Sequence, residues 1–144
     1  MFAPKSHVQT AVTAAWEHSR PMDGLHRVLG FAVVGGFGLL MVWGFGARIA
    51  KRDPGAWFWR LLAAEQVVLG LQVVAGIVLL TIKGFDARPV LHYLYGSVFP
   101  ITVLVITHVF ARDLERDQYF PFAVAGLICF GLTLRALMTG LGIG

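Results

Sequence analysis

The chain has 144 residues, of which 57% are hydrophobic and only 14% are charged, and its formal net charge is +4. A soluble domain is typically about half apolar and about a quarter charged, so this composition excludes an ordinary soluble protein. The basic residues are scattered among short segments and form no concentrated stripe, which argues against a nucleic-acid partner. The single cysteine, Cys129, excludes an intramolecular disulfide and any multi-cysteine metal site.

The N-terminal segment, residues 1–23, lacks the basic start, apolar core and cleavage site of a signal peptide. From Ser6 onward it predicts a short amphipathic helix that lies at the membrane surface or against a partner. Residues 20–24, which include Pro21, are expected to break this helix. We therefore divide the chain into an N-terminal surface helix with its linker and a membrane bundle over residues 24–144.

Four apolar runs follow, and each is long enough to cross a bilayer, which takes about 20 residues of helix. They cover approximately residues 25–47, 58–82, 90–111 and 119–141. The predicted fold class is all-α, an integral membrane four-helix bundle with up-down connectivity. Its first partner is thus the lipid bilayer. Pro100 is expected to kink the third span.

The loops between the spans differ in their content of lysine and arginine. The first loop holds three of these residues and the third holds two, so the odd loops together hold five, against two in the second loop. Short loops rich in lysine and arginine favour the cytoplasmic side of a membrane. We therefore expect both termini to lie outside the cell, in the plasma membrane of a prokaryote.

The first and third spans begin with the same pattern, a histidine followed by a glycine four residues later. The pairs are His26 with Gly30 and His92 with Gly96. In an up-down bundle these two spans run in the same direction, so both histidines should lie at one depth, near the outer face. Residues four apart share a helix face, so each glycine should leave room below its histidine for a flat ring.

Two imidazoles at matched depth suit a haem better than a bare metal ion. Neighbouring helices pack about 8–10 Å apart, so diagonal ones lie about 11–14 Å apart and leave room for one metal atom between two inward-pointing rings. A zinc ion would want further protein ligands, whereas porphyrin iron needs only two axial ligands. We expect one haem b per chain, with His26 and His92 as iron ligands. Arg27 and Arg135 are candidate partners for its propionates.

Other interpretations of these polar residues remain open. Taken singly, each histidine also fits a polar residue at the membrane interface that is hydrogen-bonded to a neighbour. His108 lies near the opposite face without a matching histidine, which argues against a second haem. Glu65 and Gln66 fit a proton or quinone site, and they also fit helix capping or hydrogen bonding between helices.

The motifs as a set resemble the haem A synthase family. The resemblance rests on His26-Arg27 opening one span, the stretch Glu-Gln-Val-Val-Leu-Gly at 65–70 on the next, and His92 opening the third. It covers roughly residues 25–104 and extends to residues 135–140. Members of the family contain two similar four-helix bundles, each with a histidine pair directed at a haem near the outer face. The resemblance implies that this chain corresponds to one such half, without the outer-loop cysteine pair of some members.

Three functional hypotheses follow. The leading one is a membrane haem protein for electron transfer, with a quinol or another redox protein as partner, or for haem handling linked to a respiratory complex. The second is a cofactor-free structural subunit of a larger respiratory or photosynthetic complex, with other membrane subunits as partners. The third, which the resemblance implies, is a haem-modifying enzyme in which a homodimer rebuilds two bundles.

Overall fold

The computed structural model describes residues 7–85 and 88–143, with side chains from Arg20 onward. The helices are α1 (His7–Ile49), α2 (Ala56–Lys83), α3 (Val90–Tyr93), the π-helix η2 (Leu94–Val98), α4 (Phe99–Arg112) and α5 (Tyr119–Gly140). Because α3, η2 and α4 follow one another without a gap, they form a single span. Four segments are long and apolar enough to cross a membrane: Arg20–Ile49, Ala56–Lys83, Val90–Arg112 and Tyr119–Gly140. The predicted all-α four-helix membrane bundle is confirmed, with boundaries shifted by a few residues.

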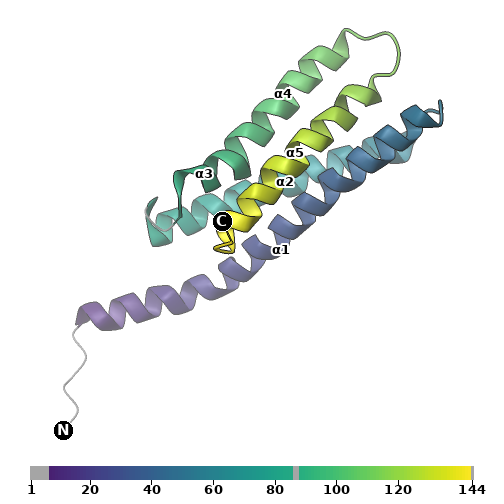
Figure 1. The fold of residues 1–144 in the computed structure, drawn as a ribbon. Coiled ribbons are helices and arrows are strands. Elements are labelled where there is room, and N and C mark those ends of the chain that lie inside the picture. Colours follow the sequence, from purple (N-terminus) through teal and green to yellow (C-terminus); the bar gives the residue numbers. More distant parts are fainter. Residues whose placement is uncertain (1–6, 86–87, 144) are drawn as a thin grey trace.

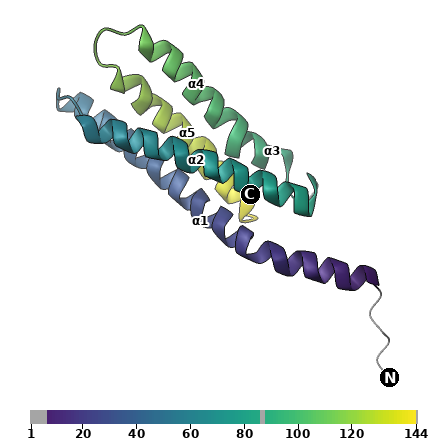
Figure 2. The same ribbon diagram turned by 180° about the vertical axis from the view of Figure 1, so that it is seen from behind.

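The position of α5 determines how the bundle is arranged (Figures 1 and 2). On one side α5 packs along α1, and on the other it packs against the third span, while α2 packs against α1. Over the residues that the structure describes, the backbone of α2 comes close to the third span only at η2, and the backbone of α1 does not come close to it. The first and third spans are therefore diagonal partners.

The first helix differs from the prediction. A break at residues 20–24 was expected, but α1 runs without interruption through Pro21, so the expected linker is wrong. A proline inside a helix removes one hydrogen bond and crowds the carbonyl four residues earlier, which a helix accommodates by bending. Figure 1 shows the N-terminal part of α1 leaving the bundle at an angle. The amphipathic face expected there involves side chains outside the described ones, and its membrane-surface position stays a prediction.

The kink expected at Pro100 takes the form of a π-helical turn. The backbone N–H of Phe99 donates to the carbonyl of Leu94, five residues earlier. Pro100 has no N–H to donate, and a wider turn directly before it lets the chain pass the ring. One additional residue rotates the preceding helix by about 100° relative to the following one. The π-turn therefore sets the direction in which His92 points.

The apolar core lies towards the end of the bundle opposite His26 and His92. Phe37, Phe58 and Cys129 are completely buried there. The Phe58 ring makes edge-on contacts with Trp43, Trp59 and Tyr119, with ring centres 5.6–6.3 Å apart. These contacts join α1, α2 and α5 into one aromatic cluster.

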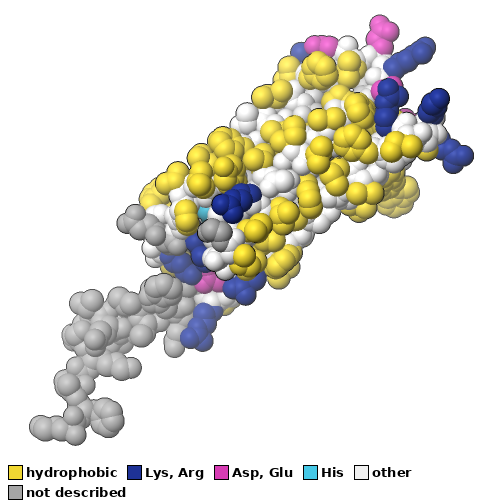
Figure 3. All heavy atoms as spheres, viewed as in Figure 1, with side chains coloured by type: hydrophobic (Ala, Val, Ile, Leu, Met, Phe, Trp, Pro, Cys, Tyr) yellow, Lys and Arg dark blue, Asp and Glu magenta, His cyan; other side chains and the backbone are white. Residues whose placement is uncertain are grey.

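The outer surface of the bundle is mainly apolar, as contact with lipid requires. Figure 3 shows hydrophobic side chains along the visible flank of the bundle, with charged side chains gathered at its ends. Large apolar residues such as Val28, Val67 and Phe110 point outward. The Trp57 ring is 67% exposed and carries the Arg60 guanidinium 4.6 Å from its centre, as expected for an aromatic residue at a membrane–water interface.

Two glycines allow α1 and α5 to approach closely. A Cβ atom at Gly44 would collide with Ala123, and one at Gly126 would lie 3.2 Å from the carbonyl oxygen of Phe37. Because lipid provides no hydrophobic drive for helix pairing, membrane helices depend on such close packing. The α1–α5 contact therefore relies on small side chains.

We expect Gly44→Leu to lower the free energy of unfolding by about 1–3 kcal/mol, because overpacking forces the helices apart. Gly46→Leu is the matched control, since a Cβ at Gly46 meets nothing within 4 Å. Thermal unfolding of both variants in detergent, followed by circular dichroism, measures the difference. Equal losses of stability would contradict the packing described here.

Candidate functional site

The two histidines selected from the sequence meet at one end of the bundle, here called the histidine end. His26 in α1 and His92 in α3 are half-buried, with ring centres 6.2 Å apart and planes inclined by 64°. Two imidazoles on one metal atom would have ring centres roughly 6 Å apart, since each metal–nitrogen bond is about 2 Å and each nitrogen lies about 1 Å from its ring centre. The rings are thus spaced as two ligands of one metal atom would be.

His92 is fixed in orientation by α5. Its Nδ1 lies 2.9 Å from the carbonyl oxygen of Ala136, with the Thr139 hydroxyl 3.3 Å away. A carbonyl can only accept, so Nδ1 carries the hydrogen in this contact and Nε2 keeps its lone pair. Within the described residues Nε2 has no hydrogen-bond partner. Metal-bound histidines are commonly anchored in this way, by a hydrogen bond from the nitrogen that does not bind the metal.

His26 belongs to a polar cluster that is incompletely bonded. Its Nε2 lies 3.5 Å from the amide nitrogen of Gln72 on α2, which is a long contact. Its Nδ1 and the amide oxygen of Gln72 are buried, and neither has a hydrogen-bond partner in the part of the chain that the structure describes. Buried polar atoms nearly always form hydrogen bonds. This cluster therefore contains hydrogen-bonding atoms that the described part of the protein leaves without a partner.

Glycines on neighbouring helices make room for both rings. A Cβ atom at Gly76 of α2 would lie 3.3 Å from Cε1 of His26, and one at Gly140 of α5 would lie 3.0 Å from Cε1 of His92. Sequence reasoning missed both, because a glycine that accommodates a side chain of another helix leaves no local signal.

The two glycines chosen from the sequence face other residues. A Cβ at Gly30 would lie 3.3 Å from the amide nitrogen of Gln72 and 3.6 Å from the Leu137 side chain, and one at Gly96 would lie 3.5 Å from Cβ of Ala136. Gln72 and Ala136 are the hydrogen-bonding partners of the two histidines. Gly30 and Gly96 therefore face the residues that hold the rings, rather than open space below them.

The predicted arginines lie on the surface of the bundle. Arg27 and Arg135 are both exposed, and among the described residues neither side chain forms an ion pair. Arg88, which sequence reasoning missed, lies two residues before the start of α3, which carries His92. The histidine end thus carries basic side chains that are free to meet an anionic group.

An ion pair joins α1 to α2 at the histidine end. The Lys83 ammonium lies 2.7 Å from a carboxylate oxygen of Asp23, and both side chains are only partly exposed. Asp23 is three residues before His26, so this pair fixes the start of the first span against the end of the second. Sequence reasoning missed it, because 60 residues separate the partners.

The histidine pair supplies only two metal donors. In the described ranges 7–85 and 88–143, no group of three or more His, Cys, Asp or Glu residues is placed to hold a metal ion. A metal atom between His26 and His92 would therefore take its other ligands from a macrocycle or from another molecule.

A second polar feature lies deeper in the bundle. Glu65 of α2 is only 4% exposed, and one of its carboxylate oxygens has no partner among the described residues. The other oxygen lies where a Cβ atom of Gly36 would be. The carboxyl group of Glu65 therefore fits only because Gly36 has no side chain. The adjacent Gln66 contacts His108 of α4, 3.4 Å away, which confirms hydrogen bonding between helices for Gln66.

Comparisons of the chain with protein-family models, with curated proteins and with solved structures found no match. The resemblance to the haem A synthase family thus rests on the motifs around His26, Glu65 and His92 alone.

We expect Gly36→Ala to lower the free energy of unfolding by about 1–3 kcal/mol, because the new methyl group collides with the buried carboxyl group. Gly35→Ala should have little effect, since a Cβ there meets nothing within 4 Å. In a Glu65→Ala background, Gly36→Ala should cost much less, because the two positions are coupled by direct contact. Thermal unfolding in detergent compares the wild type with the two glycine variants, Glu65→Ala and the double variant. An unchanged cost in that background would show that Glu65 is not what Gly36 accommodates.

Proposed function

We propose that the protein is a membrane haem protein that binds one b-type haem between His26 and His92 and takes part in electron transfer. The observation that supports this most directly is the 6.2 Å separation of the two ring centres. Each ring also has one nitrogen without a hydrogen-bond partner in the described chain, Nδ1 of His26 and Nε2 of His92.

The number of donors favours a haem over a bare ion. Two imidazoles satisfy only half of the coordination of a tetrahedral zinc ion, but they complete that of porphyrin iron. His26 and His92 would hold a bound haem, and the haem would supply one-electron redox chemistry. Because both histidines would be used to hold the iron, electron transfer is the function that this ligand set supports best.

The residues around the pair would have distinct roles. The Ala136 carbonyl orients the His92 ring, and Gln72 lies against the His26 ring. Arg27, Arg88 and Arg135 provide positive charge at the same end of the bundle for carboxylate groups of a ligand. The loop-charge pattern in the sequence supports an outward-facing histidine end.

We expect purified wild-type protein to carry one haem per chain and to show a sharp α-band after reduction with dithionite. His26→Ala and His92→Ala should each reduce the haem content by about tenfold or more, because each removes an iron ligand. His108→Ala is the control, since this histidine lies about 24 Å farther along the third span, at 1.5 Å per residue. Absorption spectra and a pyridine haemochrome assay measure the content.

Two outcomes would contradict the proposal. One is a wild-type protein that stays colourless after reconstitution with haemin. The other is full haem retention in either of the first two variants. The first outcome would favour a structural subunit without a cofactor, and the second would show that other residues bind the haem.

A further inference from the structure

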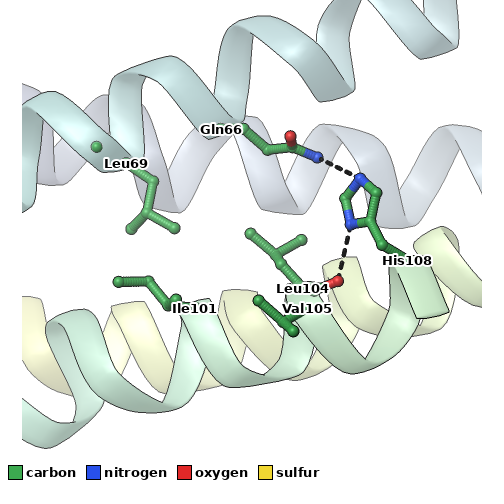
Figure 4. Close-up of a pocket in the computed structure, with 7 residues that line it drawn as sticks. Gln66, Leu69, Ile101, Leu104, Val105 and His108 are labelled. Atoms are coloured by element: carbon green, nitrogen blue, oxygen red, sulfur yellow. Dashed lines mark hydrogen bonds between the residues drawn. The ribbon is translucent and has the colours of Figure 1, made fainter.

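A groove separates α2 from α4, where the third span stands away from α2. Its volume is about 230 Å³. Three residues of α2 (Gln66, Leu69 and Gly70) and three of α4 (Ile101, Leu104 and His108) line most of it. Figure 4 shows the two polar side chains together at one end and the apolar side chains along the rest. The groove is thus apolar with a polar end.

The polar end offers both a hydrogen-bond donor and an acceptor. Nδ1 of His108 lies 2.8 Å from the carbonyl oxygen of Leu104, so this nitrogen is the donor and Nε2 is left as an acceptor. Nε2 meets the Gln66 amide nitrogen at 3.4 Å, a long contact that a better partner can replace. A ligand with ring oxygens could accept from the Gln66 amide or donate to His108.

The surroundings of the groove select for a lipid-soluble ligand. Exposed apolar side chains, including Val67, Ile101 and Val105, flank it, so it opens towards the acyl chains of a bilayer. Pockets for drug-sized ligands have volumes of about 300 Å³ or more. A volume of about 230 Å³ therefore suits a single ring, with any tail remaining in the lipid.

We propose that this groove binds the ring of a lipid-soluble quinone or quinol, with its tail in the bilayer. An oxygen of either form accepts from the Gln66 amide, and a hydroxyl of the quinol form donates to Nε2 of His108. The proposed quinone binding depends only on the groove. A role for the bound quinol in electron transfer depends also on the proposed haem. Oxidation of one bound quinol to a quinone would release two protons and two electrons, which would reduce two ferric haems by one electron each.

The groove and the histidine pair lie towards opposite ends of the bundle. His92 and His108 are 16 residues apart, which corresponds to about 24 Å of helix, and the hydrocarbon core of a bilayer is about 30 Å thick. Leu69, Gly70 and Ile101 form the part of the groove nearer to the histidine end.

Photoaffinity labelling in nanodiscs tests this proposal, with a short-tailed azido-quinone as the probe and decylubiquinone as the competitor. We expect labelled peptides from α2 and α4, and loss of the label with excess competitor. Gly70→Leu should abolish specific labelling, because a Cβ there meets nothing within 4 Å and the new side chain can fill the groove. Gly131→Leu, in similarly open space on α5, is the control and should label like the wild type.

Gln66→Leu should weaken the competition by decylubiquinone about threefold to tenfold, which corresponds to the loss of one hydrogen bond from the Gln66 amide to a quinone oxygen. Labelling that is absent, that persists in Gly70→Leu, or that decane displaces as well as decylubiquinone does would overturn the quinone site. Specific labelling in a protein that binds no haem would support the groove and reject only the proposed haem function. A haem-loaded protein without specific labelling would reject the groove and leave the haem proposal intact.

Discussion

The histidine pair depends on α5, because the backbones of α1 and the third span do not come close to each other. Gly126 brings α5 close to α1, while Ala136 and Gly140 face the third span on the other side. Lipid gives helices no hydrophobic reason to associate, so close backbone approach sets their separation. By contacting both helices, α5 determines how far His26 and His92 can reach towards each other. The hydrogen bond from His92 to Ala136 then fixes one ring on the same helix.

Polar residues inside membrane spans are energetically costly, and in this protein several of them lie on α2. Intramembrane polar groups usually face the bundle interior and commonly mark functional sites. Here α2 carries three of them: Gln72 reaches the histidine end, Glu65 fills the gap at Gly36, and Gln66 points to His108. A helix that only filled space would not need such residues. The second span therefore connects the two proposed sites along the length of the bundle.

The sequence predicted the elements well and the contacts between them only partly. Apolar runs located the four spans, and the up-down order placed His26 and His92 at one depth. The same reasoning expected a break at Pro21, yet a proline can bend a long helix without ending it. The π-turn before Pro100 and the ion pair of Asp23 with Lys83 depend on neighbours distant in sequence. No local pattern distinguishes glycines that accommodate another helix's side chain, such as Gly76, from glycines that face lipid.

Pulsed electron paramagnetic resonance on oxidised protein with ¹⁵N-labelled histidine tests the central claim most directly. If His26 and His92 both bind one haem iron, the spectrum should show a low-spin ferric signal coupled to one labelled nitrogen from each of two imidazoles. The His26→Ala and His92→Ala variants should each lose that signal. A high-spin signal, or coupling to a single imidazole in the wild type, would contradict paired histidine ligation.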